Sequence, residues 1–200
     1  MGLGALLGGR PGLTRPRLPG LWSLLPFAPP DPAIQDHSPL GAALDRLVDW
    51  DALAASPVPL SFPTVDFDTG EEVWFDSRRD RLTGRHLLAA TALAPVFPAV
   101  EVGGRRLCDG GLSDNLPVRA AFDGARGPLL CLASDLFCPG GGPAPVGLDG
   151  VLSRVQDLAF AAQARRGIEA VAHERALARR LDPALPPAVL GRVRFAAPPH

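Results

Sequence analysis

The sequence predicts a mixed α/β fold, and three patterns carry that prediction. Two pairs of short apolar runs, at 57–76 and 100–108, are each interrupted by a turn sequence and are typical of β-hairpins. A continuous apolar run at 128–137 has the length of a buried strand. Apolar residues then recur near helical spacing from 148 to 181. Strands and helical segments in one chain of 200 residues indicate a single α/β protein.

The first fifty residues are predicted to contain one substantial helix. Seven prolines between positions 11 and 32 exclude a long helix there, and residues 1–9 resemble the tail of a helix ended by Gly8 and Gly9. Residues 36–50 have a helix start, because Asp36 or Ser38 can cap and Pro39 suits the first turn. The apolar face of that helix would comprise Leu40, Leu44, Leu47 and Val48.

The middle of the chain is predicted to hold two hairpins with a helix between them. Residues 57–69 and 72–76 form the first pair of strands, with Asp68-Thr69-Gly70 at the turn. Residues 83–93 form a helix that Thr83 opens and Ala94-Pro95 closes. The second hairpin pairs 100–102 with 105–108 across Gly103-Gly104, and it leads the chain directly to Asp109.

The last third is predicted to contain a strand, a loop, a long helix and a short final strand. An uninterrupted apolar strand such as 128–137 is typical of a parallel sheet buried on both faces. The loop 138–147 matches neither a dinucleotide-binding nor a P-loop pattern, so we interpret it as a linker. Gly167 is a candidate interruption of the helix 148–181, and 193–195 would form the final strand.

Composition excludes several classes of protein. The net charge of −1 gives no reason to expect a nucleic-acid partner. All basic residues are Arg, which we interpret as the codon usage of a GC-rich, bacterial genome. Three cysteines, Cys108, Cys131 and Cys138, fit neither a disulfide framework nor a zinc site. No apolar run approaches the length of a spanning helix or forms a signal peptide, so we expect a cytoplasmic protein.

One segment contains a candidate catalytic residue. In LCDGGLSDNLPV, Leu107–Val118, Asp109 ends a strand and precedes Gly110 and Gly111. The glycines let the backbone turn sharply and let another group approach, so this carboxylate can act as an acid or base. The pattern Asp-Gly-Gly alone is more often an ordinary turn. Ser113 can meet Asp109 or, alternatively, cap the next turn.

The rest of the chain adds no second catalytic group. No GxSxG nucleophile motif occurs, and no His, Cys, Asp or Glu cluster has metal-ligand spacing. We therefore expect neither a metal nor another cofactor. The histidines are scattered and have no serine motif beside them; they are His37, His86, His173 and His200.

Five consecutive pieces together resemble the C-terminal half of patatin-like phospholipases. They are Ala89–Leu93, Pro95–Val100, Val102–Cys108, Asp109–Gly111 and Asn115–Pro117. The order and spacing of these pieces are specific, and Gly8–Val118 carries the stronger part of the resemblance. The remainder is similar to a bacterial branch with an additional C-terminal domain. We thus predict two regions: 1–125, part of a patatin-like domain, and 126–200, a family-associated extension.

The resemblance implies a fold, a reaction and a role for Asp109. The implied fold is a three-layer α/β/α sandwich, present here without its N-terminal strands, so a strand such as 129–137 would expose edges and apolar faces. The implied reaction is hydrolysis of lipid acyl esters by a Ser–Asp dyad, in which Asp109 orients and deprotonates a serine. The family also implies peripheral contact with a membrane.

The nucleophile and the Gly-rich oxyanion loop of that family have no counterpart in this sequence. We therefore expect a fragment, the C-terminal part of a hydrolase, which is inactive alone and meets its substrate only when completed by an N-terminal half. A second hypothesis is a complete, non-catalytic module that binds lipid or another protein. A third is an unrelated α/β domain, in which Asp109 is only a turn residue.

Overall fold

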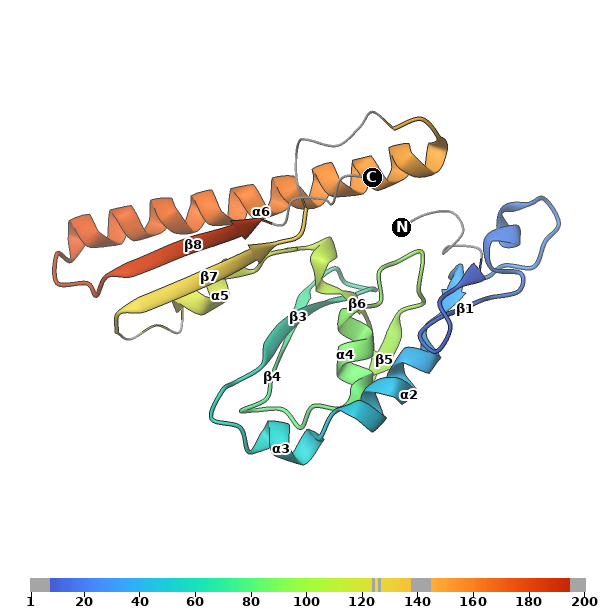
Figure 1. Ribbon diagram of the computed structural model, residues 1–200, viewed down its shortest axis with the longest axis horizontal. Coiled ribbons are helices and arrows are strands. Elements are labelled where there is room, and N and C mark those ends of the chain that lie inside the picture. Colours follow the sequence, from blue (N-terminus) through green and yellow to red (C-terminus); the bar gives the residue numbers. More distant parts are fainter. Residues whose placement is uncertain (1–7, 124, 126, 138–144, 195–200) are drawn as a thin grey trace. The chain divides into compact units, whose positions relative to one another are not determined.

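The structure is a computed structural model that describes residues 8–123, 125, 127–137 and 145–194 (Figure 1). The chain divides into two compact units, Met1–Ser113 and Asp114–His200. Both units contain strands and helices, so the predicted mixed α/β class is confirmed. These units are defined by how compactly the chain packs, whereas the predicted boundary at 125/126 separates two family regions. The boundary at 125/126 therefore stays a prediction.

The first unit is built on a four-stranded antiparallel sheet in the order β4-β3-β6-β5. Its strands are β3 Ser61–Asp66, β4 Glu72–Asp76, β5 Val100–Val102 and β6 Arg105–Asp109. Both predicted hairpins are therefore confirmed. Gly103 and Gly104 have φ of 59° and 79°, as a primed hairpin turn requires. The two hairpins join through β3 and β6, where Thr64 pairs with Asp109.

Helix α4, Gly84–Ala90, packs on one face of this sheet. Ala89 and Ala92 are fully buried against Val100 and Leu107. The helix begins as predicted at Thr83, whose amide is bound by the His86 side chain in a capping box. It ends at Ala90, three residues before the predicted end.

The segment before β3 differs from its prediction. It contains β1 Arg15–Pro16, the 3-10 helix η1 Gly20–Leu24, β2 Gln35–Asp36, and the helices α2 Ser38–Leu47 and α3 Trp50–Ala54. The prediction of one helix over 36–50 is wrong, because the Asp49 carboxylate accepts a hydrogen bond from the Ala52 amide at 2.9 Å and starts a new helix. Leu47 is consequently 82% exposed. The predicted helix tail at 1–9 lies mostly outside the described residues.

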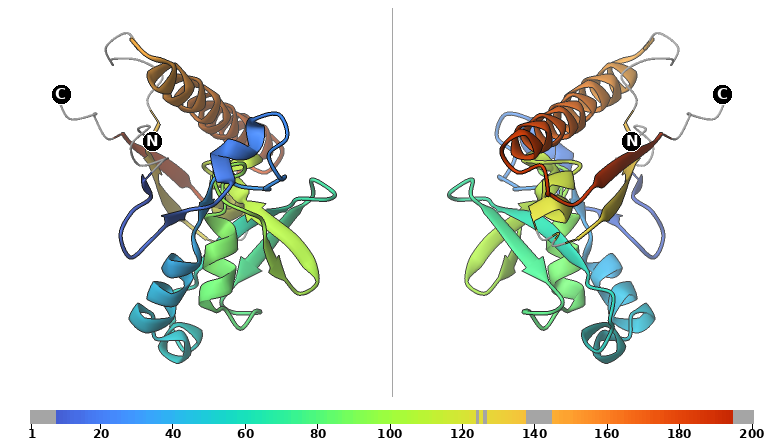
Figure 2. Two further views of the ribbon diagram at one scale, coloured as in Figure 1. Left: turned by 90° about the vertical axis from the view of Figure 1, so that its right-hand side faces the viewer. Right: turned by 90° about the vertical axis from the view of Figure 1, so that its left-hand side faces the viewer.

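The second unit is a β-α-β arrangement with a short helix, α5 Val118–Asp123. Strands β7 Leu129–Asp135 and β8 Ala188–Arg194 run parallel, and α6 Leu148–Leu181 connects them. Figure 2 shows α6 as one continuous helix, so Gly167 does not interrupt it. Strand β8 starts five residues earlier than predicted, and most of the predicted linker, 138–144, is outside the described residues.

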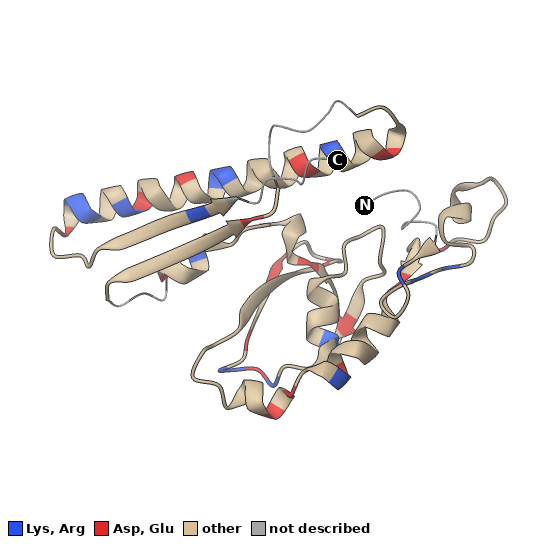
Figure 3. Cartoon of the chain, viewed as in Figure 1, with Lys and Arg blue, Asp and Glu red and all other residues tan. Residues whose placement is uncertain are grey.

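The two faces of the β7–β8 sheet differ sharply in burial. On one face, Ala133 is 4% exposed and packs with Val118 of α5 and Val171 of α6. On the other face, Leu130 and Leu132 are 66% and 69% exposed. The predicted parallel pairing is thus confirmed, whereas burial of this strand on both faces is wrong, because helices cover only one side. Figure 3 shows a basic segment on β8 and an acidic one at the end of β7, with uncharged residues along the rest of both strands.

No helix in the described part of the chain is both long enough and apolar enough to cross a membrane.

Candidate active site

Asp109 ends β6, where pairing with β3 and a backbone hydrogen bond hold it. Its neighbour across the sheet is Thr64, which is fully buried and donates its hydroxyl hydrogen to the Val73 carbonyl at 2.9 Å. The Asp109 amide donates to the Ala92 carbonyl just after α4 at 3.1 Å. The chain then turns into the 3-10 helix η2, Gly110–Leu112. Sheet and helix together fix the direction in which the carboxylate leaves the strand.

The Asp109 carboxylate is partly buried and has one oxygen in use. Oδ1 accepts a hydrogen bond from the Gly111 amide at 2.8 Å, an Asx-turn contact. Oδ2 accepts no hydrogen bond from any of the described residues. Burial raises the pKa of the Asp109 carboxyl above its usual 3.8, and the Gly111 hydrogen bond offsets only part of that rise. A carboxylate in this state is a better proton acceptor than an exposed one, and it has a free oxygen with which to accept.

Gly110 allows β3 to approach the turn closely. A Cβ atom built at this position would lie 2.7 Å from the Pro63 carbonyl carbon and 2.8 Å from Pro63 Cγ. These distances are shorter than any normal contact between such atoms, and the Pro63 backbone belongs to the middle of a paired strand. The glycine is therefore required by packing, and its packing sets the position of its neighbour Asp109.

Gly110→Ala is expected to destabilise the protein by about 2 kcal/mol, because β3 or the turn must move to admit a methyl group. The measurement is urea-induced unfolding followed by circular dichroism. Gly127→Ala is the matched control, because a Cβ there meets no atom within 4 Å. Equal unfolding midpoints for the two variants would contradict the packing role of Gly110.

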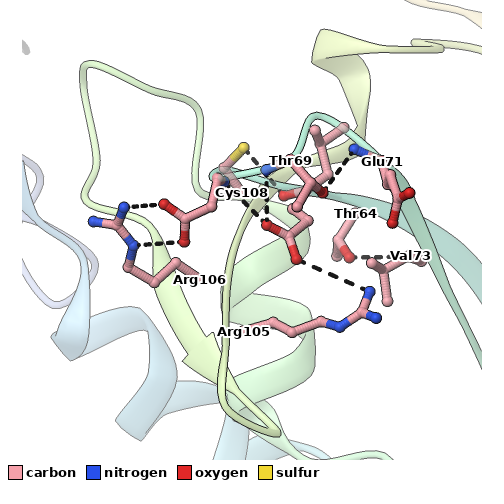
Figure 4. Close-up of polar contacts among 10 residues, drawn as sticks. Thr64, Thr69, Glu71, Val73, Arg105, Arg106 and Cys108 are labelled. Atoms are coloured by element: carbon pink, nitrogen blue, oxygen red, sulfur yellow. Dashed lines mark hydrogen bonds and ion pairs between the residues drawn. The ribbon is translucent and has the colours of Figure 1, made fainter.

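The residues before Asp109 alternate between the two faces of the sheet. Cys108 is buried and its thiol donates to the Val65 carbonyl at 3.4 Å (Figure 4). Arg106 binds the Asp68 carboxylate with two guanidinium nitrogens. Arg105 lies 3.9 Å from Asp66, and Figure 4 shows its side chain leaving the strand in a different direction from that of Arg106. The expectation that Cys108 and Asp109 face apart follows from strand alternation and stays a prediction.

Ser113 does not meet Asp109. Its hydroxyl donates to the Glu72 carboxylate of β4, so neither the contact with Asp109 nor the capping of the following turn is found. Pairing of β4 with β3 brings Glu72 to this loop from 41 residues away. No local signal in the sequence could have shown it.

The histidines that the structure describes are not among the hydrogen-bond partners of the Asp109 side chain. His37 is 3% exposed and its ring lies 4.8 Å from the Phe97 ring, and burial lowers the pKa of its imidazole. His86 packs edge-on against Phe75 and caps α4. His173 lies in α6, and His200 is outside the described residues. Among the residues that the structure describes, no group of three or more His, Cys, Asp or Glu could hold a metal ion.

A pocket of about 490 Å³ lies beside α4, and no local pattern of residues indicated it. Its wall includes Leu107, which is two residues from Asp109 on the same strand and the same face. Residues from three separated segments line it, so only the folded sheet brings them together.

Residues 62–122 match the family model for patatin-like phospholipases. The match begins in β3, includes β4, α4, β5 and β6, and ends in α5. No curated protein matches the chain. The interpretation of this region as an unrelated α/β domain is therefore wrong. The sheet, Asp109 and the turn that follows it lie inside the matched region, so residues 62–122 are similar to the patatin-like phospholipase family.

Proposed function

We propose that this chain supplies the aspartate of a Ser–Asp dyad in a lipid acyl hydrolase, with Asp109 as that aspartate. The observation that carries the proposal is the state of its carboxylate, which is partly buried, has a raised pKa and keeps Oδ2 free at the end of β6. The patatin-like match over 62–122 supports a lipid hydrolase family. Gly110 and Gly111 complete the motif by setting the turn and binding Oδ1.

In this mechanism Asp109 accepts the proton of a serine hydroxyl while the serine Oγ attacks the ester carbonyl carbon. The tetrahedral intermediate collapses, the bond to the alcohol oxygen breaks, and Asp109 returns the proton to that oxygen. Water then attacks the acyl-serine ester, with Asp109 accepting a proton from water and returning it to serine Oγ as the acid leaves. The carboxylate ends the cycle unprotonated.

The serine and the oxyanion donors must come from another polypeptide segment, because the chain has no GxSxG motif. The uncovered face of the β7–β8 sheet supports such a partner. Parallel sheets are normally covered on both faces, yet this face presents Leu130, Leu132, Val189 and Val193 to solvent. We propose an N-terminal half carrying the nucleophile as the missing component, and peripheral membrane contact by the completed enzyme.

A fluorophosphonate probe tests the proposal on the purified 200-residue chain. We expect no specific labelling, because such probes react with an activated serine and Asp109 alone offers none. A serine hydrolase of known activity in the same reaction shows that the probe is competent, and heat-denatured chain sets the background. Labelling above that background would show that a serine of this chain is activated and would overturn the requirement for a second segment.

A non-catalytic module that binds lipid or another protein is the alternative function. The same exposed apolar face of β7 and β8 favours it, since large apolar patches mark interaction surfaces. Sedimentation velocity combined with thermal unfolding separates the two. A soluble monomer that unfolds cooperatively supports the complete module, whereas aggregation relieved by co-expression with a nucleophile-bearing half supports the dyad proposal.

A further inference from the structure

The pocket beside α4 has an apolar wall and a basic rim. Val73 and Phe75 of β4, Val102 of β5 and Leu107 of β6 form the wall. All four pack on the α4 side of the sheet, where they adjoin the core. The volume of about 490 Å³ lies within the range of small-molecule sites, which are mostly apolar with a few convergent polar groups.

Two arginines at the rim have unused hydrogen-bond donors. Arg85 binds the Glu101 carbonyl through Nε, and its terminal nitrogens donate to none of the described residues. Arg105 has only the 3.9 Å ion pair with Asp66, which is too long for a hydrogen bond. Both guanidinium groups can therefore donate hydrogen bonds to an anion without losing a short hydrogen bond that they already make.

Asp66, which is not a lining residue, is the carboxylate paired with Arg105. The other polar groups of the lining itself bring no negative charge into the pocket. Glu101 contributes its carbonyl, and strand alternation directs its side chain to the face opposite Val100 and Val102. The His86 ring packs on Phe75, and its Nδ1 accepts the Thr83 amide hydrogen at 3.1 Å. Burial lowers the pKa of His86, which keeps the ring neutral at pH 7. The charge of the rim thus comes from arginine at every pH of interest.

We propose that this pocket binds an aliphatic chain with an anionic head, with the chain along Val73, Phe75 and Leu107 and the head at Arg85 and Arg105. Carboxylates and phosphates both match the planar donors of a guanidinium. The inference goes beyond the proposed hydrolase function, because binding at this rim needs neither Asp109 nor a nucleophile. The intact 200-residue chain should therefore show it.

Isothermal titration with sodium octanoate at pH 7.5 tests the proposal directly. We expect saturable binding that tightens up to about fourfold per methylene from hexanoate to octanoate to decanoate, as burial of each CH₂ predicts. Octan-1-ol should bind at least tenfold more weakly than octanoate. Octyl phosphate in a parallel titration shows which head group the pocket prefers. Tighter binding than octanoate indicates that the ligand is a phosphate ester, and weaker binding indicates that it is a carboxylate.

The double variant Arg85→Gln/Arg105→Gln is expected to weaken octanoate binding at least tenfold. Arg106→Gln is the matched control, because Arg106 follows Arg105 but binds Asp68 away from the pocket, and its affinity should change less than twofold. Absence of saturable binding, or octanol binding as tight as octanoate, overturns the proposal. The octanoate–octanol comparison uses the unchanged protein and decides the matter even if a variant fails to fold.

Discussion

Asp109→Asn is expected to lower kcat for ester hydrolysis about 1,000-fold in a polypeptide that contains both this chain and the nucleophile serine. Asn has nearly the shape of Asp and its oxygen can still accept the Gly111 amide hydrogen, but it cannot take a proton from serine. Hydrolysis of p-nitrophenyl octanoate measures kcat. An unchanged kcat would remove Asp109 from the mechanism.

The same substitution gives a stability readout that needs no nucleophile. Because folding raises the pKa of Asp109, the native state binds its proton more tightly than the unfolded state, and the ionised side chain destabilises the fold at pH 7. Asp109→Asn should therefore raise the Tm of the 200-residue chain at pH 7, and the gain should shrink as the pH falls towards 3.8. A lower Tm at pH 7 would show that the Asp109 carboxylate stabilises the fold. It would contradict the view that burial of this carboxylate lowers stability and is kept for function.

Arg192→Met is expected to destabilise the protein by about 3 kcal/mol, because it leaves a buried carboxylate without its counter-charge. The Asp135 side chain is 0% exposed, and Arg192 Nε donates to its Oδ2 at 3.0 Å, with a second contact from the same guanidinium. Its other oxygen accepts the Phe137 amide hydrogen. Urea unfolding at pH 7 gives the free energy of unfolding.

A second substitution separates loss of the pair from loss of packing. Asp135→Asn/Arg192→Met should recover most of the stability, since a neutral amide is far easier to bury than an unpaired charge. Arg165→Met is the control: its ion pair with Glu169 is largely exposed and should contribute less than about 1 kcal/mol. If Arg192→Met costs no more than Arg165→Met, the buried pair does not stabilise the second unit.

Local patterns were sufficient for most of the secondary structure. The Gly103-Gly104 turn, the Thr83 start of α4 and the apolar repeat of α6 each depend on residues within a few positions of one another. The prediction failed where two local signals competed. Leu47 fitted the apolar face of a helix through Trp50, but the Asp49 carboxylate caps a new helix and Leu47 faces solvent.

The candidate residue could be identified without a structure, because Asp109, its two glycines and the absence of a GxSxG serine can all be read from the chain. The surroundings of Asp109 could not, because they depend on how distant segments pack. Pairing of β3 with β6 places Thr64 and Pro63 beside Asp109 and Gly110, Glu72 binds Ser113, and one face of β7 is left uncovered. These relations join residues more than 40 positions apart or depend on which surface a helix covers. Burial and its effect on the pKa follow from such long-range packing, which no local pattern records.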